Sequence, residues 1–496
     1  MNLAHLIDEH AADHVAIISR GVETTYGQLR DDVARVRGGL SRLGVVPGDR
    51  VALLCGNGLY FVETYLAALG IGAVIVPLNP QSPAPEIQRE ITTIGAAVVL
   101  VEPIAAAAWT GIDPAAIPSV RHVIATDANG LDTELQFDDL ISAEPIDIVE
   151  VDADALAALI FTSGTAGSPR AAMLSHGNLL ANIQQGRSAP GRIHADDVVY
   201  GVLPMFHIFG LNVMLGLTLD NGATLVLVQR FDPSTTLDTI RERGITVIPG
   251  APPMWVDFSR FDEAAADSFA GVRLALTGAA KMPEEATRLL QQRFGLQLAE
   301  GYGLTEASPV VTSSAGLPLK IGSVGKVLDG VTVRVVDESG DDVLQGDSGE
   351  IWVKGANVFQ GYLDDPEQTA RVLTADGWLR TGDVAVTDDD GYLYLVDRAK
   401  DLIIVSGFNV YPAEVEDVIS QHPAVAEVGV AGVPHPHSGE AVKAWVVVRD
   451  GMTLDEDTLI TWCTDRLARY KCPSKVLFVD QLPRNVSGKL LRRSLS

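Results

Sequence analysis

Apolar residues in the first two thirds of the chain occur in short continuous runs that alternate with amphipathic segments. The apolar runs predict strands at 223–228, 245–248, 274–276 and 296–298. The amphipathic segments predict helices at 233–243 and 284–294. Asp232 before Pro233 is typical of a helix start. Alternating strands and helices predict parallel sheets covered by helices, which is an α/β fold.

The pattern changes after about residue 330, where short runs are separated by turn residues. Strands predicted at 331–336, 350–353 and 392–396 indicate antiparallel hairpins and a small β-barrel. Further along, strands are predicted at 402–405, 428–430, 443–448 and 476–479, and helices at 412–421 and 457–469. We therefore expect a large N-terminal domain, residues 1–397, and a smaller C-terminal α+β domain, residues 398–496.

The length and the charge of the chain narrow its functional class. A chain of 496 residues exceeds the roughly 250–300 residues that one core supports, so at least two domains are expected. The formal net charge of −27 argues against a surface that coats nucleic acid, because such a surface needs clustered Lys and Arg. A small anion held by backbone N–H groups and a few local cations remains compatible with it.

The cysteines and the longest apolar stretch bear on location. Three cysteines without a CxxC pair fit a reducing compartment and give no metal-site signal. The first residues lack the basic and apolar regions of a signal peptide. The longest apolar stretch, 65–78, is shorter than the ~20 residues that span a bilayer, and we interpret it as a buried helix running into a buried strand. We expect a soluble, cytoplasmic protein without a transmembrane segment; its oligomeric state stays open.

Four polar segments carry candidate chemistry, and the strongest follows an apolar strand at 155–161. Residues 162–170 read Thr-Ser-Gly-Thr-Ala-Gly-Ser-Pro-Arg. Glycines allow backbone N–H groups to turn toward an anion, hydroxyls add donors, and Arg170 adds charge, which is typical of a polyphosphate cradle. The Walker A pattern is absent, and a flexible surface loop is the alternative.

The second segment, 300–306, also follows a predicted strand. Tyr302 lies between two glycines and can present its ring face to a flat base. Glu306 is a candidate ligand of Mg²⁺, which favours a carboxylate together with phosphate oxygens. Taken alone, the segment also fits an ordinary Gly-Tyr-Gly turn with a solvated Glu.

Two further segments are weaker functional signals when each is taken alone. Asp383, in 381–383, is a candidate acceptor for ribose hydroxyls, and Arg398 can reach a phosphate or a hydroxyl. A surface patch of salt bridges is the alternative. Near the C-terminus, segment 483–489 ends in Lys489, which is either a mobile charge for a substrate or an ordinary surface lysine.

In this order the four segments resemble the motifs of the adenylate-forming superfamily: acyl-CoA synthetases, firefly luciferase and the adenylation domains of peptide synthetases. The resemblance covers essentially the whole chain. It implies an ATP- and Mg²⁺-dependent carboxylate–CoA ligase that forms an acyl-adenylate, releases pyrophosphate and then AMP, and takes coenzyme A as co-substrate. The segments expected to line the acid pocket, 207–212, 250–255 and 278–280, hold no cation for a second carboxylate. We therefore expect a fatty or aryl monoacid, and we favour a fatty acid.

The resemblance also implies a role for individual residues. The loop that would hold the β- and γ-phosphates of ATP comprises Thr162, Ser163, Gly164, Thr165, Ala166, Gly167, Ser168, Pro169 and Arg170. Residues implied around the nucleotide are Gly278, Gly301, Tyr302 (adenine), Gly303, Thr305 (α-phosphate), Glu306 (Mg²⁺), and Asp383 with Arg398 (ribose). Residues implied for catalysis and thioester formation are Lys489 (substrate carboxylate and α-phosphate), Lys400 (hinge), Ser406, Gly407 and Phe408 (pantetheine tunnel) and His207 (tunnel entrance).

Two positions depart from the family pattern. Arg170-Ala171 stands where Lys-Gly is usual, which keeps the charge but makes it planar and bulkier. Gly278-Ala279-Ala280 stands where Gly-Gly-Ala is usual, which narrows the pocket by a methyl group.

Two other functions remain as alternatives. A fatty-acyl-AMP ligase passes its acyl group to a carrier protein, and such relatives carry an insertion and a degraded hinge motif. Here 350–383 has no obvious insertion and the hinge motif 397–401 is intact. A nucleotide-binding protein that has lost turnover is the other alternative, supported only by the two departures.

Overall fold

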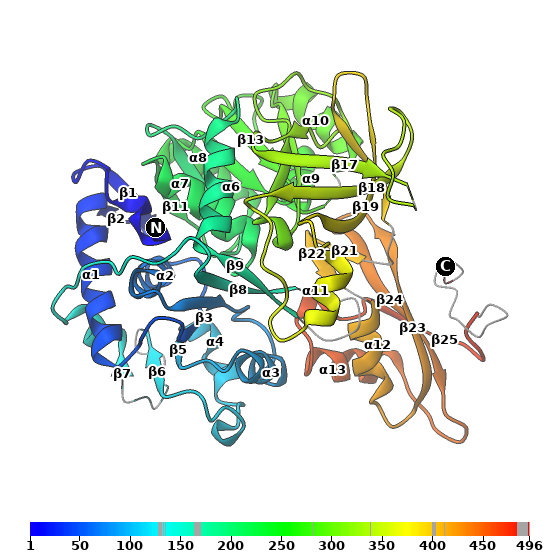
Figure 1. Ribbon diagram of the computed structural model, residues 1–496. Helices are drawn as coiled ribbons and strands as arrows, with labels where there is room; N and C mark the ends of the chain where they lie inside the picture. The colour runs from blue at the N-terminus through cyan, green and yellow to red at the C-terminus, as the bar shows by residue number, and fades with distance from the viewer. Residues whose placement is uncertain are drawn as a thin grey trace.

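The computed structural model describes residues 1–126, 131, 133, 135–162, 170–280, 282–337, 339–398, 403–410, 412–483 and 495 (Figure 1). Within these residues the largest sheet has nine strands and is parallel except at its two edges. Its order is β16 (Lys326–Val327), β15 (Val310–Ser313), β14 (Leu298–Gly303), β13 (Leu274–Thr277), β12 (Val247–Gly250), β10 (Val198–Gly201), β11 (Thr224–Leu227), β1 (Val15–Ser19) and β2 (Val22–Thr25).

A second sheet of seven strands is parallel except for its last pair. Its order is β7 (Leu135–Gln136), β6 (His122–Ala125), β5 (Val98–Val101), β3 (Arg50–Leu54), β4 (Val74–Pro77), β8 (Leu156–Thr162) and β9 (Arg170–Ser175). Strand β8 confirms the apolar strand predicted at 155–161, and its antiparallel partner β9 begins at the arginine that ends the glycine-rich segment.

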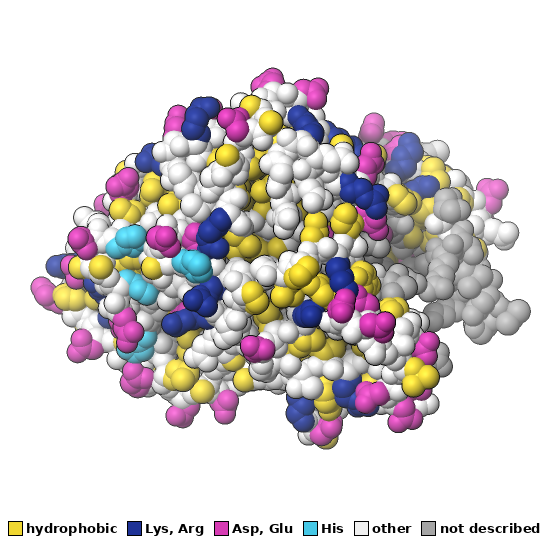
Figure 2. Space-filling view, turned by 90° about the horizontal axis from the view of Figure 1, so that it is seen from above, with side chains coloured by type: hydrophobic (Ala, Val, Ile, Leu, Met, Phe, Trp, Pro, Cys, Tyr) yellow, Lys and Arg dark blue, Asp and Glu magenta, His cyan; other side chains and the backbone are white. Residues whose placement is uncertain are grey.

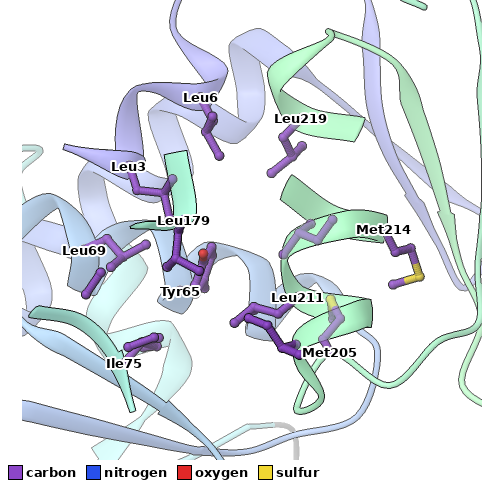
Figure 3. Packing of buried hydrophobic residues seen from close by; sticks show 14 of the residues in the cluster. Leu3, Leu6, Tyr65, Leu69, Ile75, Leu179, Met205, Leu211, Met214 and Leu219 are labelled. Carbon is purple, nitrogen blue, oxygen red and sulfur yellow. The ribbon is translucent and has the colours of Figure 1, made fainter. Parts of the chain in front are cut away.

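One apolar layer is shared by the two sheets. Its main members are η1 (Leu3–Ile7), α2 (Leu59–Ile71), α6 (His176–Ser188), the π-helical segment η3 (Phe209–Gly216) and α7 (Leu217–Asp220). Their buried residues form one cluster with residues of both sheets (Figure 3). Helix α2 is buried from Phe61 to Ile71, and β4 follows it, which confirms the buried helix and strand predicted at 65–78.

Other helices cover the outer faces of the two sheets, so the large domain has alternating layers of helices and sheets. The nine-stranded sheet packs against α8 (Pro233–Arg243), α9 (Pro252–Arg260) and α10 (Glu284–Phe294). The seven-stranded sheet packs against α3 (Ala84–Ile94) and α4 (Pro103–Trp109), followed by η2 (Pro114–Ala116). Helices α1 (Tyr26–Arg42) and α5 (Phe137–Ile141) pack beside α2. The predicted cap of α8 is confirmed, because Asp232 accepts a hydrogen bond from Thr235 N at 2.9 Å.

Antiparallel strands follow the nine-stranded sheet, as predicted. They are β17 (Val331–Val336), β18 (Gly349–Gly355), β19 (Leu379–Thr387) and β20 (Leu393–Arg398), with α11 (Pro366–Val372) against β19. Among the described residues these strands form an open sheet, so the expected small barrel is a half-barrel.

The C-terminal part is an α+β unit with its own core, as expected. Its strands are β21 (Ile403–Val405), β22 (Phe408–Val410), β23 (Val425–His435), β24 (Gly439–Val448) and β25 (Lys475–Phe478). Its helices are α12 (Pro412–Ser420), α13 (Glu456–Thr464) and the 3₁₀ turn η5 (Arg469–Lys471). In Figure 1 it lies beside α3 and below the half-barrel. The boundary expected between residues 397 and 398 falls within β20 and stays a prediction.

One predicted helix end is wrong. The helix expected at 457–469 ends at Thr464, because the chain turns and buries Leu467 and Ala468, which are both 1 % exposed. This turn brings η5 against the large domain.

No described helix combines the length and the apolar character needed to cross a membrane. On the face shown in Figure 2, basic and acidic side chains are interspersed rather than gathered into a basic stripe.

The shared apolar layer predicts a stability effect. Leu69 of α2 is fully buried in it, whereas Leu344 is 78 % exposed. We expect Leu69→Ala to lower the free energy of unfolding of the large domain by about 2–5 kcal/mol, because the substitution leaves a cavity. Leu344→Ala is the matched control and should change stability by less than about 0.5 kcal/mol. Urea unfolding followed by tryptophan fluorescence measures both; equal effects would contradict the assigned layer.

Candidate active site

One large cavity lies where the carboxyl ends of strands from both large sheets meet the half-barrel and the C-terminal unit. Its volume is about 1040 Å³. Its walls include these predicted site residues: Thr162, Arg170, His207, Gly278, Gly301, Tyr302, Gly303, Thr305, Glu306, Asp383 and Gly407. Segment 250–255 was expected to line the same pocket, but its residues Ala251 and Met254 line a smaller adjoining cavity instead.

Tyr302 connects the nine-stranded sheet to the half-barrel. Its hydroxyl donates a hydrogen bond to Oδ2 of Asp383 at 2.8 Å, and the residue is 7 % exposed. Asp383 is the register partner of Arg398 across β19 and β20. An aromatic ring and a carboxylate are therefore held side by side at the cavity wall.

The irregular stretch of β19 that carries Asp383 is fixed by hydrogen bonds within the half-barrel. The hydroxyl of Thr381 donates to the carbonyl of Ile351 at 2.7 Å and accepts from Asp383 N at 3.1 Å. Gly382 has φ of 73°, and its N–H donates to Oε1 of Glu350 at 2.9 Å. The left-handed backbone explains the glycine at this position.

Glu306 and Arg170 lie on either side of one tyrosine. The hydroxyl of Tyr362 donates to Oε1 of Glu306 at 2.6 Å. The guanidinium carbon of Arg170 lies 5.7 Å from the centre of the same ring, and its Nε donates to Oδ2 of Asp365 at 2.9 Å. A carboxylate and a cation are thus both held in place near the start of β9. A ligand that is an anion carrying a bound metal ion requires both, because the carboxylate binds the metal ion and the cation binds the anion.

The residues present fit Mg²⁺ only in company with a phosphate. Within the described part of the chain, no group of three or more His, Cys, Asp or Glu side chains could hold a metal ion. Mg²⁺ commonly takes one or two carboxylates and completes its shell with phosphate oxygens and water. Glu306, at the wall of a cavity large enough for a polyphosphate, is that kind of ligand.

Close backbone approaches explain the glycines of this wall. A Cβ at Gly303 would lie 2.2 Å from the carbonyl oxygen of Pro309, so only glycine fits. A Cβ at Gly278 would lie 3.5 Å from both Cζ of Phe209 and the carbonyl oxygen of Gly301. Both distances are ordinary van der Waals contacts, so Gly278 packs beside the ring of Phe209 and the backbone of β14 at the cavity wall.

His207 lies at the junction of the large cavity and the smaller one, which has a volume of about 130 Å³. Burial lowers the pKa of His207 to about 4, so its imidazole is neutral near pH 7. Its Nδ1 accepts a hydrogen bond from Phe209 N at 3.3 Å, which assigns the ring proton to Nε2. Its ring lies edge-on to Phe408 of the C-terminal unit, with the ring centres 6.0 Å apart.

Phe408, Ser406 and Gly407 line the smaller cavity, and their role in a pantetheine tunnel stays a prediction. Phe408 stacks on Phe206 of the large domain at 6.3 Å and on Tyr470 at 4.4 Å, measured between ring centres. Two parts of the chain thus build one narrow passage to the large cavity.

Other predicted residues lie outside the described residues, and their roles stay predictions: Ser163, Gly164, Thr165, Ala166, Gly167, Ser168, Pro169, Lys400 and Lys489. The side chain of Arg398 is also outside the description.

Sequence reasoning missed three residues that hold the predicted ones. Tyr362 bonds Glu306, Asp365 bonds Arg170, and Glu350 accepts a hydrogen bond from the N–H of Gly382. Asp365 had a signal of another kind, because an Asp before Pro366 is typical of a helix cap and its carboxylate also accepts from Gln368 N. No local signal marked Tyr362, because its partners lie far away in the sequence.

Family models match most of the chain. The model described as "AMP-binding enzyme" matches residues 4–363, and the model described as "AMP-binding enzyme C-terminal domain" matches residues 414–489.

Two curated relatives illustrate the range of similarity. A feruloyl-CoA synthase from Amycolatopsis sp is 38 % identical, over 96 % of this chain and 94 % of the relative. A long-chain-fatty-acid–CoA ligase from Bacillus subtilis is 32 % identical, over 97 % of this chain and 91 % of the relative.

Two solved structures were compared over this whole chain and 98 % of theirs. An o-succinylbenzoate CoA synthetase from Bacillus subtilis, bound to its product analogue, is 29 % identical with a TM-score of 0.88. The ATP-bound MatB from Rhodopseudomonas palustris is 34 % identical with a TM-score of 0.75.

The environment of His207 predicts its titration. We expect its ring to stay neutral from pH 8 to about pH 5 and to take up a proton near pH 4, because burial disfavours the charged form. Proton NMR of histidine-labelled protein measures this, and the His207→Gln variant assigns the resonance. A midpoint near the ordinary value of about 6.5 would contradict the buried environment.

Proposed function

The chain belongs to the family of AMP-binding enzymes, and from that premise we propose a reaction and roles for its residues. It is an AMP-forming acid–thiol ligase of the acyl- and aryl-CoA type, which uses ATP, Mg²⁺ and coenzyme A. The single observation that carries the proposed mechanism is the cavity in which Tyr302, Asp383, Thr305, Glu306 and Arg170 meet.

In the proposed first half-reaction, a carboxylate oxygen attacks the α-phosphorus of ATP. The new bond makes an acyl-adenylate, and the bond to the β-phosphate oxygen breaks to release pyrophosphate. Tyr302 would stack on adenine, Asp383 would accept from the ribose hydroxyls, and Thr305 would bind the α-phosphate. Such positioning matters more than acid–base catalysis in phosphoryl-type transfer.

Charge is the main obstacle to that step, because two anions must meet. Arg170 would contact the β- and γ-phosphates, and Lys489 would bridge the carboxylate and the α-phosphate. Glu306, oriented by Tyr362, would hold Mg²⁺, which when bound neutralises phosphate charge. Arg170 in place of the usual lysine keeps this positive charge at the loop.

In the proposed second half-reaction, the thiol of coenzyme A attacks the acyl carbon. A thioester bond forms, the bond to the AMP oxygen breaks, and the thiol proton leaves to solvent. The pantetheine arm would pass along Ser406, Gly407 and Phe408 to the neutral His207, and Lys400 would be the hinge for the small domain. Phe408 of the C-terminal unit lies against Phe206 and His207 of the large domain, which supports assigning this domain arrangement to thioester formation.

For the acid we propose a hydrophobic monocarboxylate, with an aromatic ring favoured. Phe209, which lines the large cavity beside Gly278, offers an aromatic ring against which a planar substrate ring can pack. The identity with the feruloyl-CoA synthase adds support. A fatty acid, favoured from the sequence, is the second candidate, and the similarity to a long-chain-fatty-acid–CoA ligase supports it.

A substrate panel tests this function. We expect acid-dependent ATP–pyrophosphate exchange and CoA-thioester formation with ferulate or 4-coumarate, and weaker turnover with straight-chain fatty acids. Lys489→Ala is the control and should lower exchange by about 100-fold or more. Exchange with no acid at all would instead favour a nucleotide-binding protein without turnover, and transfer to a carrier protein but not to CoA would favour a fatty-acyl-AMP ligase.

The tyrosine that orients Glu306 gives a second prediction. Tyr362→Phe removes the hydrogen bond to Oε1 of Glu306, so we expect half-maximal activity to need about 10-fold more Mg²⁺. Tyr394→Phe is a matched control. The hydroxyl of Tyr394 donates a hydrogen bond to Oδ2 of Asp388 at 3.1 Å, and Tyr394 does not line the cavity. A Mg²⁺ requirement equal in both variants and wild type would refute the assignment of Glu306.

A further inference from the structure

A buried ionic cluster joins the two domains away from the active-site cavity. Nζ of Lys471 donates to Oε1 of Glu86 and to Oε1 of Glu414, both at 2.9 Å. Oε2 of Glu86 also accepts from the backbone N–H of Ala468 at 2.7 Å. Lys471 is 4 % exposed, and Glu86 and Glu414 are 2 % exposed. Charged residues are seldom buried to this degree unless they are paired, and the pairing of Lys471 with Glu86 and Glu414 meets that condition.

The partners of Lys471 belong to different domains. Glu414 lies on α12 of the C-terminal domain that also carries Lys471, whereas Glu86 lies on α3 of the large domain, 385 positions away in the sequence. The pair of Lys471 with Glu414 can therefore persist when the domains separate. The bonds to Glu86, from Lys471 and from Ala468, form only when they are docked.

The cluster is continuous with the passage described above. Tyr470 precedes Lys471 in η5 and stacks on Phe408 at 4.4 Å. Phe408 in turn contacts Phe206 and His207 of the large domain. A displacement of Lys471 from Glu86 would move Tyr470 with it and would open the stack that encloses the passage.

We propose that Glu86 and Lys471 are positioning residues that hold the small domain in its thioester-forming arrangement. The inference rests on the proposed function, because it assigns the docked arrangement to the second half-reaction. Neither residue touches the large cavity. Their effect is on the fraction of molecules that are docked, and the rate of thioester formation scales with that fraction.

The charge balance of the cluster links docking to pH. The groups that face Glu90, which is 6 % exposed on α3, are Glu86, Arg89, Glu414, Tyr470 and Lys471. Burial and the carboxylate of Glu86 raise the pKa of Glu90 to about 8. Undocking exposes this face of α3 to water, so the pKa returns toward the usual value of about 4.3. At a pH between these two pKa values, Glu90 takes up a proton when the domains dock. The docking equilibrium therefore weakens as pH rises to about 8 and is independent of the charge of Glu90 above that pH.

The two half-reactions of the full-length enzyme, assayed separately, test the proposal. Glu86→Gln removes the charge, and Glu86→Ala removes both hydrogen bonds. We expect thioester formation from preformed acyl-adenylate and CoA to fall by about 10-fold in Glu86→Gln and further in Glu86→Ala. ATP–pyrophosphate exchange should stay within about 2-fold of wild type, because Glu86 faces water when the domains separate. Glu23→Gln, which alters an exposed carboxylate on β2, is the matched control and should change neither rate.

The outcomes distinguish the positioning role of Glu86 and Lys471, which we call the latch, from the enzyme's function. A wild-type enzyme that forms no thioester with any acid refutes the proposed function. If the wild-type enzyme forms a thioester but the Glu86 variants lose both half-reactions equally, the latch is refuted. It is also refuted if those variants lose neither half-reaction. A general loss of folding would lower both rates together and would therefore also count against the positioning role.

The Glu90→Gln variant tests the pH dependence. Its side chain is neutral at every pH, so its rate of thioester formation relative to wild type should rise between pH 6 and about 8 and be constant above that. A ratio that does not change with pH would remove Glu90 from the latch while leaving the contact of Glu86 with Lys471 to be judged by the first assay.

Discussion

The position of the active site depends on the apolar layer that the two large sheets share. Helix α2 is buried nearly all round, so both sheets must lie against it, and η3 and α6 complete the layer. Packing at this density leaves little freedom in how the sheets face each other. The ends of β8, β13 and β14 are therefore brought together by burial of residues such as Leu69 and Leu211, which take no part in the chemistry. The close approach at Gly303 then shapes the wall between them.

Local patterns predicted the elements that have local causes. The cap at Asp232 and the apolar run of β8 each follow from neighbouring residues, and both are present. The end of α13 was missed because burial of Leu467 against distant residues decides it. The tyrosine that orients Glu306 was missed for the same reason, since its partner is 56 positions away. The motif residues were identified by resemblance, whereas the bonds that orient them required the fold.

A chain with a net charge of −27 nonetheless builds a site for anions. Distant carboxylates are screened by salt over about 10 Å, so the local set of groups decides what binds. Arg170 is held by Asp365 and by the face of Tyr362, so its positive charge has a fixed place at the wall of the cavity. The neutral His207 adds a polar group at the passage without adding charge. Separate control of charge at the two ends of the cavity suits a reaction whose first step brings anions together and whose second does not.

An interface that must open in every catalytic cycle has conflicting requirements. A purely apolar interface would expose an apolar, aggregation-prone surface whenever the domains separate. A surface ion pair would hold the domains too weakly, because such pairs contribute little. The cluster at Lys471 meets both needs: Glu86 is an ordinary solvated group on α3 when exposed, and becomes a directional partner of Lys471 only when covered. The excess of carboxylates over cations limits how tightly the interface closes, since each added negative charge must be protonated or left unpaired. Buried charge at this place is thus better explained by reversible docking than by stability.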